Sequence, residues 1–361
     1  MGRKIKLGFI GTGMMGRNHI MAIQKHFSSE AEVSAICDAN KEELEKGKKL
    51  APEARSFSNW EDLLNEDLDG VIISTPTYTH AEISIAALNA DKYVLSEKPV
   101  AINKEECWKM VKNSEKSNKS IMIGHELRYS QYWAKIKEIV DSGLIGTPHL
   151  LWWKEFRGRF LPKIGNWIQD KKRSGGALVD KNCHHFDLMN WYLNKKPKTV
   201  AAFGGTDVIR VIKNKNEVED NAVVIVEYEK KARAALLLCM FAPIYFPEPL
   251  EFGIFGDKGF LGTIVSENKI IVIPREKAED IEEVNRDFKY KKEANDTITY
   301  FVAPVKGDYG GHTGFIEEHR EFLEVIKTGK KPLTEVKECV YGTLIPLCAE
   351  ESIERKGVIK I

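Results

Sequence analysis

The chain has 361 residues, too many for one ordinary hydrophobic core and enough for two domains. Its 54 basic and 53 acidic residues leave a net charge of +1, which argues against nucleic acid or an anionic membrane as a partner. No stretch approaches the length of a membrane span. The six cysteines include no C-x-x-C pair, so we predict no metal and a reduced, cytoplasmic protein.

The first 125 residues alternate strand and helix patterns. Asn40 with Glu43, and Asn103 with Glu106, are typical of helix starts. Apolar runs predict strands at 5–10, 32–37, 69–74, 92–96 and 119–124, with helices at 14–25, 80–89 and after each cap. This order indicates a parallel sheet covered by helices on both faces, which we take as a first domain, 1–125.

Residues 126–361 have a different pattern and are expected to form a second domain. Strand-like stretches dominate, at 147–156, 199–206, 221–228, 232–241, 250–255 and 269–273. They predict a large, open, mostly antiparallel sheet with helices on one side. The clearest helices are expected at 186–193, at 313–328 before the stop signal Gly329, and at 334–355.

A glycine-rich loop, Gly11-Thr12-Gly13-Met14-Met15-Gly16, follows the first predicted strand and opens the first predicted helix. In that context the pattern is typical of a dinucleotide site, where the loop backbone and the helix N-terminus hold a pyrophosphate. Asp38 ends the second strand, where a carboxylate accepts hydrogen bonds from the adenosine ribose and repels a 2′-phosphate. We therefore expect NAD, with NADP left open by the nearby Lys41. The alternatives are a purely structural glycine turn and an Asp38 that only forms a turn.

Two further clusters carry groups that can move protons. Lys98 follows a predicted parallel strand, at the edge where open α/β sheets bind ligands, and Pro99 can fix that turn through a cis bond. Asp180 and His184 are four residues apart, so in a helix both lie on one face and the carboxylate tunes the imidazole. The alternatives are a surface lysine and a surface Asp/His pair. A metal at this pair lacks a third ligand at suitable spacing.

Together these motifs resemble the Gfo/Idh/MocA family, named for glucose–fructose oxidoreductase, inositol dehydrogenase and rhizopine catabolism. The resemblance spans essentially the whole chain. The matching segments, in the family's order, are 8–16, Ser74-Thr75-Pro76-Thr77-Tyr78-Thr79-His80, Glu97-Lys98-Pro99, Arg128-Tyr129, 142–146, the Gly-Gly…Asp180…His184…Asp187 run, and 349–352.

The resemblance implies a Rossmann domain followed by an α/β domain, whose open sheet commonly forms a homodimer or homotetramer interface. It implies Lys98, Asp180 and His184 as the catalytic trio. His184 takes the hydroxyl proton, Asp180 tunes it, and Lys98 hydrogen-bonds the same oxygen. The cofactor contacts implied are the six loop residues 11–16 with Asp38, Ser74, Thr75, Pro76, His80, Glu97 and Lys98.

Two positions depart from the family's pattern. Asn182 stands where glycine is usual, two residues before His184, and Asn tolerates a left-handed backbone better than most residues. Asp91 stands where glycine usually precedes the Glu-Lys-Pro strand, and Asp is a tolerable substitute at a helix end.

The substrate is expected between the nicotinamide and the sheet of the second domain, where aromatic faces and charged donors suit a sugar. Beside the trio, the candidate contacts are Arg128, Trp153, Arg157, Trp167 and His312, with His125, Trp152, Lys154 and Arg159 as weaker ones. For each tryptophan the alternative is a place in the core.

The leading hypothesis is an NAD(P)-dependent oxidoreductase acting on a secondary alcohol or ketone of a sugar or cyclic polyol. A glycosidase that oxidises its sugar transiently would use the same groups. A cofactor-binding regulator without chemistry is the third alternative, and the presence of all three trio residues argues against it.

Overall fold

The computed structural model describes residues 3–158, 163–209, 218–243, 245–275, 289–293, 295–302 and 312–361. The chain divides into two compact units, Met1–Tyr129 with Gly307–Thr343, and Ser130–Lys306 with Leu344–Ile361. The expected continuous second domain, 126–361, therefore differs from this division. Phe322 and Leu323 belong to the same buried cluster as Leu7 and Phe9, so the chain returns to the first unit late in the sequence.

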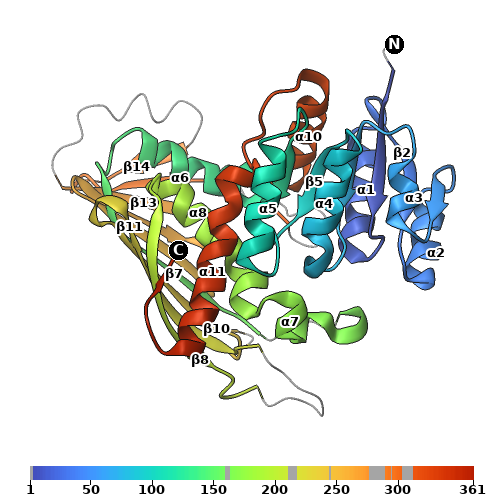
Figure 1. The fold of residues 1–361 in the computed structure, drawn as a ribbon. Coiled ribbons are helices and arrows are strands. Elements are labelled where there is room, and N and C mark those ends of the chain that lie inside the picture. Colours follow the sequence, from blue (N-terminus) through green and yellow to red (C-terminus); the bar gives the residue numbers. More distant parts are fainter. Residues whose placement is uncertain are drawn as a thin grey trace. The chain divides into compact units, whose positions relative to one another are not determined.

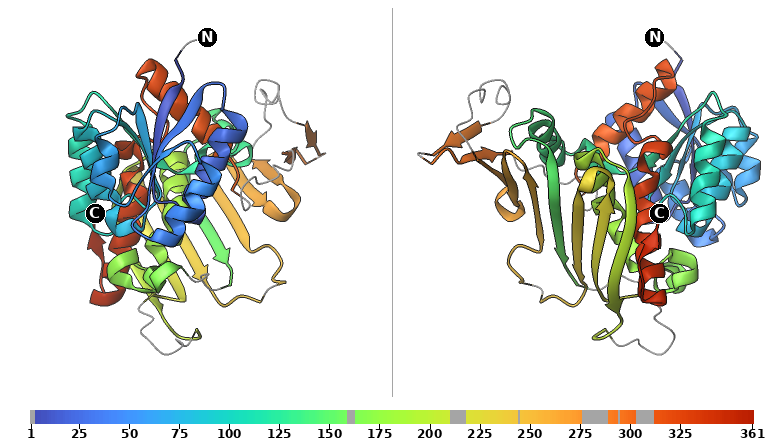
Figure 2. Two further views of the ribbon diagram at one scale, coloured as in Figure 1. Left: turned by 90° about the vertical axis from the view of Figure 1, so that its right-hand side faces the viewer. Right: turned by 60° about the vertical axis from the view of Figure 1, so that its left-hand side comes forward.

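The first unit is built on a parallel six-stranded sheet of order β3-β2-β1-β4-β5-β6. Helices flank it on both faces, as predicted (Figures 1 and 2). Its strands are β1 Ile5–Ile10, β2 Ala31–Cys37, β3 Arg55–Phe57, β4 Gly70–Ile73, β5 Tyr93–Glu97 and β6 Ile121–Gly124. Its helices are α1 Met14–His26, α2 Lys41–Leu50, α3 Trp60–Leu64, α4 His80–Asn89, α5 Lys104–Ser114 and α10 Phe315–Thr328, and α11 Val336–Arg355 begins in it.

The helix boundaries have local causes. The Asn40 side chain accepts hydrogen bonds from two backbone N–H groups at the start of α2, and Asn103 caps α5 by accepting from the backbone N–H of Glu106. After α4, Asp91 takes a φ of +56°, so it adopts the left-handed conformation that glycine usually supplies there. Gly329 ends α10 with a φ of +70°.

The second unit is built on a ten-stranded sheet of order β14-β15-β13-β12-β11-β7-β10-β9-β8-β16 (Figure 2). Its pairs are antiparallel except β7 with β10, which confirms a mostly antiparallel sheet. The strands are β7 Pro148–Phe156, β8 Pro197–Gly205, β9 Asn221–Tyr228, β10 Arg233–Cys239, β11 Leu250–Gly256, β12 Gly259–Ile264, β13 Lys269–Pro274, β14 Lys289–Lys292, β15 Ile298–Phe301 and β16 Ile359–Lys360. Its helices are α6 Gln131–Asp141, α7 Lys171–Ser174, α8 Ala177–Leu193 and the later part of α11.

Successive residues of strand β7 face opposite sides of this sheet. Trp153 and Glu155 are buried on the face that carries α8, whereas Trp152 and Lys154 lie on the opposite face. Trp152 stacks there on Phe260, with ring centroids 5.6 Å apart. Among the helices that the structure describes, none combines the length and apolar composition that a membrane crossing requires.

Candidate active site

The three glycines of the loop between β1 and α1 meet different requirements. Gly11 has a φ of +94°, and Ser74 Oγ donates to its carbonyl at 2.9 Å. A Cβ on Gly16 would lie 1.9 Å from that carbonyl oxygen, so α1 approaches β1 closely only when residue 16 is glycine. At Gly13 the φ of −61° suits any residue, so the backbone does not require glycine there. A Cβ at this position would meet no described atom within 4 Å, so the space beside it is open. The space beside Gly13 therefore fits a pyrophosphate at the start of α1.

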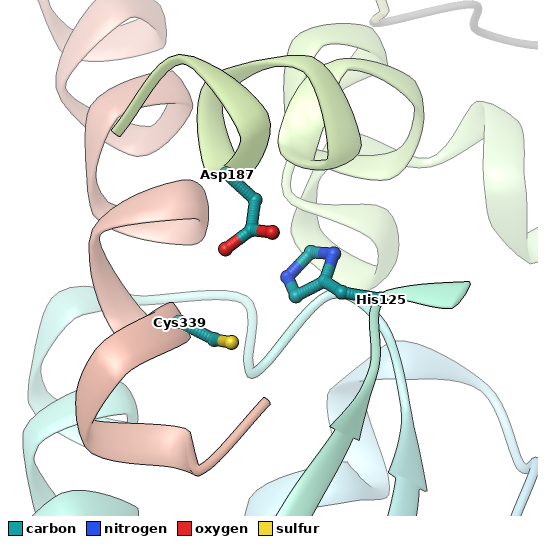
Figure 3. Close-up of side chains that lie close together, drawn as sticks. All are labelled: His125, Asp187 and Cys339. Atoms are coloured by element: carbon teal, nitrogen blue, oxygen red, sulfur yellow. The ribbon is translucent and has the colours of Figure 1, made fainter. Parts of the chain in front are cut away.

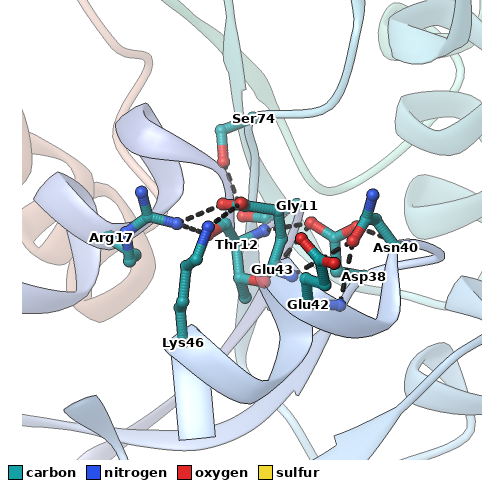
Figure 4. Close-up of polar contacts among 9 residues, drawn as sticks. All are labelled: Gly11, Thr12, Arg17, Asp38, Asn40, Glu42, Glu43, Lys46 and Ser74. Carbon is teal, nitrogen blue, oxygen red and sulfur yellow. Dashed lines mark hydrogen bonds and ion pairs between the residues drawn. The ribbon is translucent and has the colours of Figure 1, made fainter. Parts of the chain in front are cut away.

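Asp38 is fixed against this loop (Figure 4). One carboxylate oxygen accepts from Thr12 N at 2.8 Å, and the other accepts from Asn40 N at 2.8 Å. The contact with Asn40 is the turn-forming role considered for Asp38, and the contact with Thr12 places the carboxylate beside the loop. The turn-forming role is therefore present, and ribose binding by Asp38 stays a prediction. Of the other loop residues, Met14 is exposed and Met15 is half-buried.

A small charge cluster lies behind the same loop (Figure 4). Arg17 donates to the carbonyl of Thr12 at 2.7 Å, and Arg17 and Lys46 both form ion pairs with Glu43. Burial acts to raise the pKa of Glu43, but hydrogen bonds from Lys46 and Arg17 lower it below its usual value. Glu43 thus pairs with two cations beside the loop and offsets part of their charge. The preference for a ribose with free hydroxyls over a 2′-phosphate therefore depends on the Asp38 carboxylate.

His80 links the two strand ends that follow. Its ring nitrogens lie 2.8 Å from the carbonyl oxygen of Pro99 and 2.9 Å from that of Thr75. Burial lowers the pKa of His80, so the ring is neutral and donates to one of the two carbonyls. The structure thereby brings the Ser74–Pro76 turn and the Lys98 turn together, with His80 itself buried between them.

Lys98 directly follows β5, at the carboxyl edge of the parallel sheet. The Lys98–Pro99 peptide bond is cis, as the sequence indicated. The Lys98 backbone N–H donates to the Glu97 carboxylate at 3.2 Å. Burial acts to raise the pKa of Glu97, but the hydrogen bond and charge of His19, with the charge of Lys98, lower it to about 2. The turn therefore holds an ionised carboxylate next to an amine.

In the second unit, Asp180 and His184 lie on α8, one helical turn apart and on one face. Both residues were expected on one face if this segment is a helix, and the segment is helical. Asp180 is buried, and its carboxylate pairs with Lys181 Nζ at 3.2 Å, while His184 is half-buried.

The second glycine before α8, Gly176, is required by a carboxylate. Gly176 has a φ of +110°, and a Cβ there would lie 2.2 Å from Glu350 Oε1. The same Glu350 oxygen accepts from Leu178 N at 3.4 Å, and Lys171 pairs with Glu350 at 2.8 Å. The start of the helix that carries Asp180 and His184 is therefore held by the buried Glu350 carboxyl, which pairs with the half-buried Lys171.

Asn182 is not left-handed, so the reason given for its tolerance was wrong. It lies inside α8, fully buried, and is not among the residues with positive φ. Its Nδ2 donates to Glu155 Oε2 at 2.7 Å and lies 3.0 Å from His185 Nδ1. Asn182 therefore ties α8 to β7. Glu155 was missed from the sequence, although an acidic residue at an inward position of an apolar strand was a usable signal.

Three of the expected substrate contacts belong to the second unit. Trp153 is fully buried and packs on His185 with ring centroids 4.6 Å apart, which matches the core alternative. Arg157 pairs with Glu155 at 3.0 Å and stays partly exposed. Trp167 is half-buried in the short helix Ile164–Gln169. Arg159 lies outside the described residues.

The other two belong to the first unit. Arg128 is buried and donates to the carbonyl of Leu333 at 3.2 Å. His312 Nδ1 lies 3.0 Å from Glu126 Oε1, and this hydrogen bond raises the pKa of His312 above its usual value. Arg128 thus has a structural contact, whereas the Glu126 carboxylate favours the protonated form of His312.

His125 and Cys339 are a candidate pair of metal ligands. Both are buried in the first unit, and their ligand atoms lie within 4.8 Å of one another (Figure 3). Figure 3 also draws Asp187, which belongs to the second unit. Within the described part of the first unit no third ligand joins the two, and zinc takes at least three from protein. We assign no metal to this pair.

Two family descriptions match the chain. "Oxidoreductase family, NAD-binding Rossmann fold" matches residues 5–125, and "GFO/IDH/MocA C-terminal domain" matches residues 133–262. The two matches together take in most of the chain. The gap between them, 126–132, contains Tyr129, where the N-terminal segment of the first unit ends.

Individual proteins agree with this. The inositol 2-dehydrogenase of Salmonella typhimurium is 32% identical over 55% of this chain, and the match spans 57% of that relative's length. The myo-inositol 2-dehydrogenase of Thermotoga maritima is 24% identical over 99% of this chain and 98% of its own. Among solved structures, the WlbA dehydrogenase of Bordetella pertussis, in complex with NADH and UDP-GlcNAcA, has a TM-score of 0.82 at 23% identity, covering 100% of this chain and 99% of its own. A levoglucosan dehydrogenase in complex with NADH and levoglucosan has a TM-score of 0.81 at 22% identity, covering 99% and 100%. These structures share the fold.

Substituting Gly16 and Gly13 in turn separates the effect of helix packing from the effect of cofactor binding. Gly16→Ala forces α1 away from β1 and is expected to lower the free energy of unfolding by about 1–3 kcal/mol. Gly13→Ala fills space that no protein atom uses, so stability stays near wild type while the Kd for NAD rises about tenfold or more. Denaturant unfolding and calorimetric titration measure the two effects. Unchanged NAD affinity in Gly13→Ala would remove the pyrophosphate from this place.

Replacing Asp38 tests the cofactor preference. Asp38→Ser removes an acceptor for the ribose and the charge that repels a 2′-phosphate, so the ratio of NAD to NADP affinity should fall about tenfold or more. Glu45→Ser, the same charge change on α2 at an exposed carboxylate, is the matched control and should leave the ratio unchanged. An Asp38→Ser protein with wild-type preference would contradict the assignment.

Proposed function

Because the chain belongs to the Gfo/Idh/MocA family of NAD-binding oxidoreductases, we propose that it is an NAD-dependent dehydrogenase or reductase. Its substrate is a secondary alcohol or ketone of a sugar, sugar derivative or cyclic polyol. The observation that carries this proposal is the loop at Gly13, where space for a pyrophosphate opens at the same sheet edge as Lys98. The relatives named inositol 2-dehydrogenase support the substrate class.

The bound nicotinamide supplies hydride exchange at its C4. In the oxidation direction, His184 removes the proton of the substrate hydroxyl, and the Asp180 carboxylate stabilises the imidazolium that forms. Lys98 donates a hydrogen bond to the same oxygen as charge develops on it.

The remaining candidates divide by their contacts. Arg157 and His312 are partly exposed, and each is held by a carboxylate, so we keep them as substrate-binding candidates together with Trp167. Arg128 and Trp153 have internal contacts that account for them, and we give them a supporting role.

We also propose that the protein forms a homodimer or homotetramer through the outer face of its large sheet, the face opposite α8. Phe203, Val223 and Leu237 are paired across three adjacent strands and are all exposed, with Phe203 at 77%. A contiguous apolar row of this kind is unusual on a monomer.

A reducing, cytoplasmic location is supported by six cysteines that form no disulfide.

The catalytic assignment is tested by Lys98→Met. Turnover should fall about 10²–10⁴-fold, the scale for groups that assist proton transfer, while NAD binding persists. Lys112→Met, an exposed lysine on α5, is the control and should keep wild-type turnover. Absorbance of NADH is followed with a panel of cyclitols, aldoses, nucleotide sugars and glycosides, with product analysis. Cleavage of a glycoside without net NADH would support the glycosidase instead, and near-normal turnover of Lys98→Met would remove lysine from the mechanism.

The assembly is tested by Val223→Lys, at the centre of the apolar row. The charge cannot be buried unpaired, so the particle mass should fall to that of a monomer in light scattering coupled to size exclusion. Leu333→Lys, an exposed apolar position of the first unit, should leave the mass unchanged. A wild-type protein that is already monomeric would overturn the proposal.

A further inference from the structure

A buried chain of hydrogen bonds leads away from the Lys98 turn and takes no part in the chemistry described above. His19 on α1 places Nε2 3.1 Å from Glu97 Oε1 and Nδ1 2.9 Å from His319 Nε2. His319 on α10 places Nδ1 2.6 Å from the carbonyl oxygen of Phe315. Both imidazoles are fully buried, and all of these residues lie in the first unit.

The acceptors at the two ends of the chain determine where the hydrogens are. The Phe315 carbonyl only accepts, so His319 Nδ1 carries a hydrogen. Burial and the neighbouring charge of His19 lower the pKa of His319 to about 3, so this ring is neutral and its Nε2 accepts from His19 Nδ1–H. Glu97 is ionised and only accepts, so His19 Nε2–H donates to it. The two contacts of His19 are therefore both satisfied when its ring carries a hydrogen on each nitrogen.

We propose that His19 and His319 are positioning residues for Lys98. His19, as a buried cation oriented by His319, matches the charge of Glu97 and fixes the carboxylate that holds the Lys98 backbone. This inference rests on the proposed function of Lys98. Since an uncompensated buried carboxylate favours the protonated form of every neighbouring base, the pair also sets the charge balance around the amine.

Other titratable groups face this cluster and are part of the balance. His312 pairs with Glu126 beside Lys98. From α10, the carboxyl of Glu318 is kept protonated, because burial and the charges of Glu126 and Glu97 raise its pKa. Glu321 on α10 and His26 on α1 act on the cluster over longer distances. None of these groups donates to Glu97 in the way that His19 does, among the contacts that the structure describes.

Selective 15N-histidine labelling of the full chain tests the proposal directly. His19, assigned by comparison with His19→Gln, should give the signature of a ring with a hydrogen on each nitrogen. His319 should give the neutral Nδ1–H signature. A neutral ring at position 19 overturns the proposal whether or not the protein oxidises a sugar, so the result does not depend on the proposed function.

Kinetics test the positioning role. His19→Gln keeps a donor to Glu97 but not the charge, so kcat should fall roughly 10–100-fold, the scale for a misplaced group, and the pH–rate profile should move to higher pH. His19→Gln/Glu97→Gln restores the charge balance and should recover part of the lost kcat and return the profile. Additive losses in the double variant, with an unmoved profile, contradict the proposal.

The matched control is at His319. His319→Gln keeps an acceptor for His19 Nδ1–H and should retain near-wild-type kcat with an unmoved pH profile, whereas His319→Leu removes the acceptor and should reproduce the His19→Gln shift. Equal losses in both His319 variants would mean that only packing matters there. Calorimetric titration of NAD on each variant separates loss of cofactor from loss of positioning.

Discussion

The close approach of α1 to the end of β1 controls the geometry of the whole nucleotide edge. It depends on Gly16, because the Cβ of any other residue there would lie 1.9 Å from the Gly11 carbonyl oxygen and overlap it. The same approach places the N-terminus of α1 at the loop and holds Ser74 against Gly11. It also fixes His19, which lies one turn further along α1 and reaches Glu97. One helix therefore sets both the phosphate loop and the lysine turn, so a shift of α1 would disturb both together.

Much of the nucleotide-binding unit could be predicted because its signals are local. The loop, the Asn40 and Asn103 caps and the short apolar strands each depend on neighbouring residues. Strand β3, which has three residues and no apolar run, was not predicted, and neither was α3. Helix α6 was not predicted either, although Tyr132, Trp133, Ile136 and Ile139 repeat at helical spacing and are all buried. That signal was present in the sequence and was passed over.

The least predictable contacts join residues far apart in the chain. His19 and His319 are separated by 300 positions, and no local pattern pairs them. The return of α10 to the first unit was missed for the same reason, because a helix pattern gives its buried face but not the surface that covers it.

The two positions that depart from the family's glycine, Asp91 and Asn182, differ in their backbone conformation. Asp91 adopts a positive φ as glycine would, whereas Asn182 is helical and acts through its side chain.

Strand β7 connects the two proposed roles of the second unit. Its inward residues Trp153 and Glu155 support α8, the latter through the buried amide of Asn182. Its outward Lys154 pairs with Glu251 at the end of the register row that runs through Leu237, Val223 and Phe203. Because successive residues of one strand face opposite sides, a change in its register would move Glu155 away from α8 and Lys154 away from the outer face. The position of the Asp180–His184 helix and the composition of the proposed interface are therefore constrained by the same nine-residue strand.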